Sequence, residues 1–191
     1  MLTHLIKSIN WLDIALAFFL LRVIYIGVKN GFITEFFKAL GVVIAVFVSL
    51  HYYAVFAAWL AKKTAFSGGF WQIVILGLLW LAVSVVFKFI RDGVLALFKI
   101  ETTHEGFDKY AAGILAVGRG ILLCSLMIFM VLLVNNGPVT RMTLHSYSYK
   151  IAGRAAVGTY SVLFNNLVDK LWAGQHYNTA AALVLHPESR K

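Results

Sequence analysis

The chain has 191 residues, of which 61% are hydrophobic and only 13% are charged, with a formal net charge of +9. Soluble domains average about 25% charged residues, so this composition argues against an ordinary soluble domain and indicates an integral membrane protein. The basic residues are scattered between apolar runs, which favours contact with lipid head groups and no nucleic-acid partner. The single cysteine, Cys124, excludes a disulfide framework or a cysteine-based metal site within one chain.

Four apolar runs predict membrane-spanning helices over residues 11–28, 32–57, 70–89 and 110–134, since about 20 residues cross the hydrocarbon core. The first two are joined by a glycine-punctuated turn in which Gly27 and Gly31 flank Lys29 and Asn30. The predicted fold class is therefore all-α: a polytopic membrane protein with four transmembrane helices plus a C-terminal amphipathic helix.

Ionisable residues interrupt these spans, and a charge near the bilayer centre costs roughly 2.5–3.5 kcal/mol. Three readings stay open: an acid on one helix pairs with an arginine on another, the charges line a polar path for a small solute, proton or peptide, or they lie at head-group depth. Asp108 and Arg119 are eleven residues apart, close to three helical turns, so they share a side of the fourth span without reaching each other. The candidates are Asp13, Arg22, Glu35, Asp108 and Arg119, and Lys38 also interrupts the second span.

Small residues recur every four positions on two of the spans. At that spacing they share one helix face and let helix backbones approach closely in lipid. We expect helix packing on the stripes formed by Gly41, Ala45 and Ser49 in the second span and by Ala112, Ala116 and Gly120 in the fourth.

Aromatic residues gather at the end of the second span, where an interfacial belt is expected. The belt would comprise His51, Tyr52, Tyr53, Phe56 and Trp59. Trp71 and Trp80 are expected to serve as belt and lipid-facing bulk in the third span.

Charges return over residues 91–110, and the apolar residues between Val94 and Ile100 predict a short amphipathic piece along the membrane surface. Glu101, His104, Glu105 and Asp108 match neither H-E-x-x-H nor an EF-hand loop, which favours a solvated loop over a metal site. No P-loop, dinucleotide fingerprint or nucleophile elbow appears in the sequence, so we expect no enzyme, no cofactor and no metal.

Asn135, Asn136, Gly137 and Pro138 predict the end of the fourth span. Helical spacing of apolar residues over 149–172 then predicts an amphipathic helix, either on the bilayer surface or docked on the bundle, and the last six residues read as a flexible tail. The chain thus divides into a four-span membrane domain, 1–135, and an amphipathic or surface segment, 136–191.

Two stretches resemble the bacterial colicin V production protein (CvpA) family. The first pairs Asp13 with GVKNGFITE at 27–35, in which Gly27, Lys29, Gly31, Phe32 and Glu35 match and Asn30 replaces a usual arginine. The second, GFDKYAAGILAVGRGILL at 106–123, places the acidic residue, the small-residue stripe and the Arg-Gly pair of the fourth span. In it, Ala112 and Ala116 stand where family members often have glycine. The resemblance covers about residues 10–135.

This resemblance implies a multi-pass protein of the bacterial inner membrane that supports production or export of a colicin V-type toxin and envelope homeostasis. It implies no established reaction, cofactor or catalytic residue. Beside the lipid bilayer, the expected partners are further copies of the chain or other envelope proteins. The intramembrane charges keep an alternative open, an oligomeric channel or small-solute transporter. The positive-inside rule does not decide which side holds the termini, because basic residues divide nearly evenly.

Overall fold

Four long helices dominate a computed structural model that describes residues 10–98, 106–171 and 175–185. They are α2 (Trp11–Asn30), α3 (Phe32–Ala61), α4 (Gly68–Phe98) and α5 (Gly106–Leu133). All four are long and apolar enough to cross a membrane. The chain is therefore an all-helical, multi-pass membrane protein, as the composition predicts.

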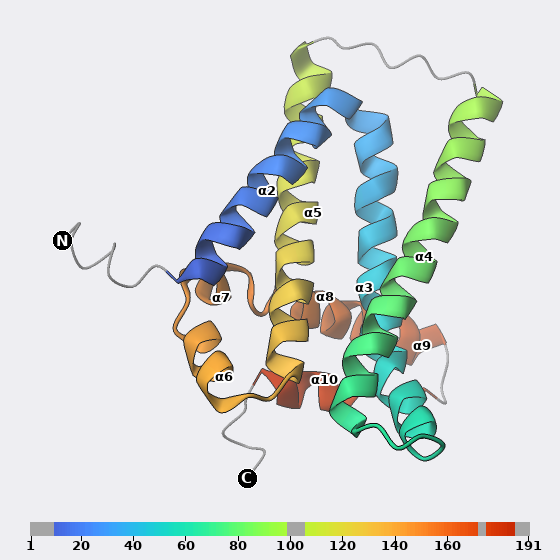
Figure 1. Cartoon of the computed structure of the whole chain (residues 1–191). Coiled ribbons are helices and arrows are strands. Elements are labelled where there is room, and N and C mark those ends of the chain that lie inside the picture. The colour runs from blue at the N-terminus through green and yellow to red at the C-terminus, as the bar shows by residue number, and fades with distance from the viewer. Residues whose placement is uncertain (1–9, 99–105, 172–174, 186–191) are drawn as a thin grey trace.

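The spans form a bundle in which α3 and α5 are the most enclosed helices (Figure 1). α2 packs mainly on α5, and α4 packs mainly on α3. The α2–α3 turn, the end of α4 and the start of α5 lie at one end of the bundle (Figure 1). The start of α2 and the short C-terminal helices lie at the other.

The third span differs from the prediction, because α4 continues without a break to Phe98. The amphipathic piece expected on the membrane surface from Val94 is instead the last part of this helix. Gly93 is the only weak helix former in the stretch, and one glycine costs a helix only about 1 kcal/mol. Of the predicted solvated loop, Asp108 belongs to the first turn of α5 instead. The other three residues, at 101–105, lie outside the described residues, as do the lead at 1–9 and the tail at 186–191.

The C-terminal segment is a chain of short helices rather than one helix over 149–172. They are α6 (Gly137–Leu144), α7 (Tyr147–Ala152), α8 (Ala155–Leu163), a π-helical turn η1 (Phe164–Val168), α9 (Asp169–Leu171) and α10 (Thr179–Val184). Ala156 and Tyr160 are fully buried against the bundle. The sequence leaves two placements open, on the bilayer surface or docked on the bundle, and the described part of the segment is docked on the bundle.

The break between α7 and α8 has a local cause in α5. The Ser125 hydroxyl donates to the Gly153 carbonyl at 3.3 Å and accepts from the Ala156 N–H at 2.8 Å. These two backbone groups lose their helical partners at the break, and a buried serine supplies replacements. A pattern of apolar spacing within the segment carries no trace of this partner.

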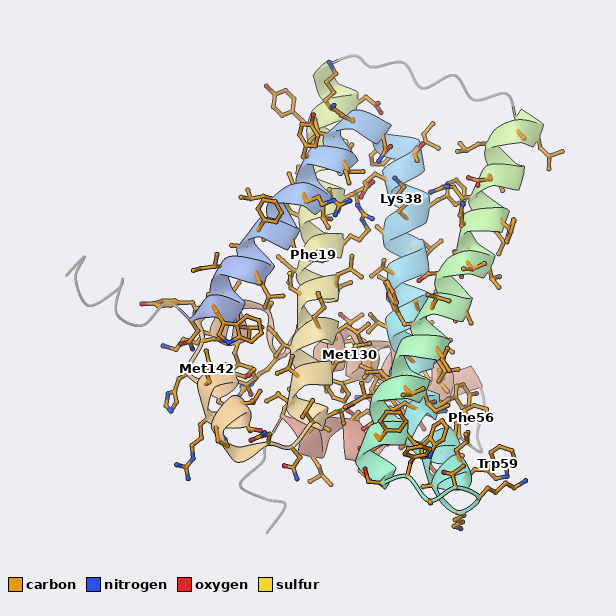
Figure 2. The ribbon with its side chains drawn as sticks, viewed as in Figure 1. Phe19, Lys38, Phe56, Trp59, Met130 and Met142 are labelled. Carbon is orange, nitrogen blue, oxygen red and sulfur yellow. The ribbon has the colours of Figure 1, made fainter. Side chains whose placement is uncertain are left out.

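The predicted aromatic belt is wrong for two of its members. Tyr53 is 1% exposed and His51 is 7% exposed, so both belong to the interior. The His51 ring contacts Tyr160 through Nδ1 and Gln175 through Nε2, each at 3.0 Å. Phe56 and Trp59 do lie on the outer surface of α3 (Figure 2). Tyr52 is exposed as well. His51 is buried because Tyr160 and Gln175 of the C-terminal segment supply hydrogen-bond partners for both of its ring nitrogens.

Trp80 is also not simple lipid-facing bulk. Its side chain is half-buried, and its indole Nε1 is fully buried with no hydrogen-bond partner among the described residues. A buried hydrogen-bond donor without an acceptor destabilises a folded protein, so the buried Trp80 N–H needs an explanation.

Candidate functional site

The turn between α2 and α3 is a single residue, Gly31, with φ 76° and ψ 163°. This region of backbone space is essentially restricted to glycine. Asp108 of α5 stands over the turn, and its Oδ1 accepts from the Phe32 N–H at 2.9 Å. The first N–H groups of a helix lack intrahelical partners, so the carboxylate caps α3 from a neighbouring span. Lys29 lies over the Tyr25 ring at 4.4 Å.

One turn into α3, Glu35 is fully buried. Its Oε1 lies 2.6 Å from Arg119 Nε of α5, and its Oε2 lies 3.7 Å from Lys38 Nζ of the next turn. The Arg119 N–H is not aligned as a hydrogen bond requires, so the short contact is an ion pair. A buried carboxylate is tolerable only when its charge is compensated, and two cations here share one acid.

Close helix contact places this cluster. A Cβ built on Gly27 would overlap the Ala116 Cβ and come within 3.3 Å of the Glu35 carboxylate. A Cβ on Gly120 would overlap a Leu20 methyl group. Gly27 and the small-residue stripe of α5 therefore let α2 and α5 meet at backbone distance beside Glu35. Within that stripe, Ala112 and Ala116 are fully buried.

The small-residue stripe of α3 faces a different neighbour. A Cβ on Gly41 would lie 3.0 Å from the Phe87 Cβ of α4, so this glycine lets α4 approach. Ala45 and Ser49 are fully buried further along the same helix. Gly27 and Gly120 thus lie at the contact between α2 and α5, and Gly41 lies at the contact between α3 and α4.

The remaining predicted charges do not join the cluster. Asp13 is buried near the opposite end of α2, about 21 Å from Gly27 along the helix at 1.5 Å per residue. Its Oδ1 accepts from the Ser148 N–H at 2.8 Å and its Oδ2 from the Asn10 N–H at 3.1 Å. It thereby caps two helices. Arg22 is exposed on the outside of α2. The structure thus brings Glu35 and Arg119 together and places Asp108 at the adjoining turn. Asp13 and Arg22 both lie away from this cluster.

Sequence reasoning did not single out Lys38 as a member of the site. The available signal was its spacing, since a lysine three residues after a glutamate lies on the same helix face. Among the described residues, no three His, Cys, Asp or Glu side chains are arranged to hold a metal ion.

A second polar cluster, at the other end of α3, was missed entirely. The Tyr160 hydroxyl accepts from the Asn178 N–H at 2.9 Å, and Asn178 Nδ2 donates to the Leu50 carbonyl at 2.7 Å. Burial raises the pKa of Tyr160. Its hydroxyl lies 3.0 Å from His51 Nδ1. His51 Nε2 lies 3.0 Å from Gln175 Oε1, an oxygen that can only accept. This cluster holds the C-terminal segment on α3.

A protein-family model described as "Colicin V production protein" matches residues 12–157. The chain belongs to this family. The match includes Glu35, Asp108, Arg119 and the Gly31 turn, and it runs past the resemblance seen in the sequence, through α6 and α7 into α8. No curated protein and no solved structure matches the chain.

Proposed function

We propose that this family member is a non-catalytic protein of the bacterial inner membrane that supports production or export of a colicin V-type toxin and envelope homeostasis. In this proposal it acts by assembling with copies of itself or with other envelope proteins. In it, residues 1–135 supply the four-span membrane domain and residues 136–191 an amphipathic or surface segment.

The observation that carries the proposal is the closed charge cluster. Both oxygens of Glu35 are taken up by cations from α3 and α5, and the carboxylate has no exposed surface. An acid held in this way ties helices together. Its role is architectural, and the outer surface of the bundle remains for contacts with other molecules.

The part of that surface best suited to assembly belongs to α4. Only 6% of its most apolar window is buried within the chain, against 44% for α3 and α5. Its bare face carries large apolar side chains: Leu78, Leu81, Val85, Val86 and Phe89. Lipid satisfies such a face, and so does a neighbouring span.

Cysteine crosslinking in native membranes tests assembly. In a Cys124→Ala background, we expect Val86→Cys on the bare face of α4 to give discrete crosslinked bands. Phe18→Cys is the matched control, since Phe18 is an exposed apolar residue on α2. A strictly monomeric pattern from both positions at native expression contradicts the proposal.

A second candidate, an oligomeric channel or small-solute transporter, is favoured by one observation. A cavity of about 390 Å³ adjoins the cluster, and both Lys38 and Arg119 line it. In liposomes, such a protein should move a solute, and Arg119→Gln should alter the flux. Absence of flux across a broad panel of solutes would count against this candidate.

A further inference from the structure

The cavity beside the Glu35 cluster has a distinctive lining. Four cationic side chains from three helices border it, and no acid does so among the described lining residues. The four are Lys38 of α3, Lys88 and Arg91 of α4, and Arg119 of α5. Figure 2 shows Lys38 on α3 in the half of the bundle nearest the α2–α3 turn.

The local acids do not neutralise these cations. Glu35 serves both Lys38 and Arg119, and Asp92 contacts Arg91 at 2.6 Å. Lys88 has no ion-pair partner in the described part of the chain. Four positive charges against two negative ones leave an excess of two, in a cavity with largely apolar walls. Such an excess attracts an anion.

A hydrogen-bond donor is also left over. Trp80 lines the cavity, and its buried Nε1 has no acceptor among the described residues. Ser84 lies one turn further along α4 and lines the same cavity. Trp80 lies eleven residues before Arg91, about 16 Å along α4, so its N–H belongs to the deeper end of the cavity. At the end nearer Arg91, phosphate oxygens are acceptors that suit lysine and arginine.

The depths of Lys38 and Arg91 suit a phosphate at the membrane interface. α3 has 30 residues, about 45 Å at 1.5 Å per residue, against a hydrocarbon core of about 30 Å. A centred helix therefore extends about 7 Å beyond the core at each end. Lys38 lies about 9 Å from the start of α3, and Arg91 about 10 Å from the end of α4. Both therefore lie within a few Å of the head-group boundary.

We propose that this cavity is a binding site for a phosphate group, held by Lys38, Lys88 and Arg91, with Arg119 behind them. A phospholipid head group and a free phosphate ion share this chemistry. Basic pockets between spans are typical sites for anionic head groups. The aromatic walls at the deeper end, which include Phe19 and Trp80, would accommodate the apolar part of a lipid.

Titration calorimetry on the purified full-length protein in mild detergent tests the site, with two probes: inorganic phosphate and dihexanoyl phosphatidylglycerol. We expect saturable binding of at least one. Lys88→Gln/Arg91→Gln should weaken it about 100-fold, since each charge-assisted contact contributes about tenfold. The control, Lys62→Gln/Lys63→Gln, makes the same charge change at exposed positions at the far end of α3. Its affinity should stay within about twofold of wild type.

The two probes distinguish the sources. Binding of phosphatidylglycerol alone identifies a lipid head group, and binding of inorganic phosphate identifies a free anion. Lys88→Gln alone removes one exposed cation that has no ion-pair partner in the described part of the chain, so a several-fold loss of affinity in that variant supports the site even if the double variant does not fold. Absence of saturable binding by either probe, or equal weakening by both double variants, overturns the proposal. The site does not depend on assembly, because a monomer that never crosslinks can still bind phosphate.

Discussion

Replacing Glu35 with glutamine should destabilise the bundle more than any other single change in the ion-pair cluster. Glu35→Gln leaves both Arg119 and Lys38 without their carboxylate. Removing one partner of a buried ion pair costs about 3–5 kcal/mol. For a protein of this size each kcal/mol shifts the melting temperature by about 2–4 °C, so the expected loss is about 6–20 °C.

The order of the variants is a sharper expectation than any one value. Arg119→Gln should cost less than Glu35→Gln, because Lys38 still compensates the carboxylate at 3.7 Å. The double variant Glu35→Gln/Arg119→Gln should be more stable than either single variant, because the remaining lysine, 19% exposed, reaches the head groups.

Thermal unfolding in detergent, followed by circular dichroism, measures all three variants. Asp92→Asn is the matched control, since it breaks the Arg91 ion pair at a site where the acid is 49% exposed. An exposed pair contributes only about 0–1 kcal/mol. The reasoning is refuted if Glu35→Gln melts with the control, or if the losses of the two single variants simply add in the double variant.

Three further changes probe the contacts around the cluster and the C-terminal segment. Gly27→Ala should lose about 1–3 kcal/mol through overlap with α5, whereas Gly93→Ala, which meets open space in α4, should gain up to about 1 kcal/mol in the same melting assay. Asp108→Ala should cost about 1 kcal/mol by removing the cap of α3, and hydrogen exchange should report faster opening of its first turn. Tyr160→Phe should cost about 1–3 kcal/mol and release the C-terminal segment to protease. Because the folded pKa of Tyr160 is raised, wild-type stability should fall as pH rises above about 10, and this variant should lose that share of the pH dependence.

The sequence carries the architecture because a membrane limits the choices. Long apolar runs in lipid must be helices, so four runs predict four spans, and the glycine turn predicts a hairpin. The same reasoning brings an acid and an arginine on different spans together, and Glu35 and Arg119 do form that pair. The free-energy cost of a charged side chain in lipid strongly limits where such side chains can lie.

The features that sequence patterns do not predict depend on contacts between residues far apart in the chain. His51 reads as an interfacial residue until Tyr160, 109 positions later, and Gln175, 124 positions later, supply its hydrogen bonds. The break in the C-terminal helix depends in the same way on Ser125. Apolar periodicity reports which face of a helix is buried, and it does not report which polar group on another helix will meet it.

The most direct test of the central claim, that the Glu35–Arg119 ion pair is architectural, is toxin production by the double variant Glu35→Gln/Arg119→Gln. It would be expressed in a colicin V-type producer strain that lacks its own copy of the protein. The account predicts toxin output close to that of the wild-type protein, because the neutral pair preserves the packing of α3 on α5. A folded, membrane-inserted double variant that supports no toxin production would contradict it and would show that the charges themselves carry the function.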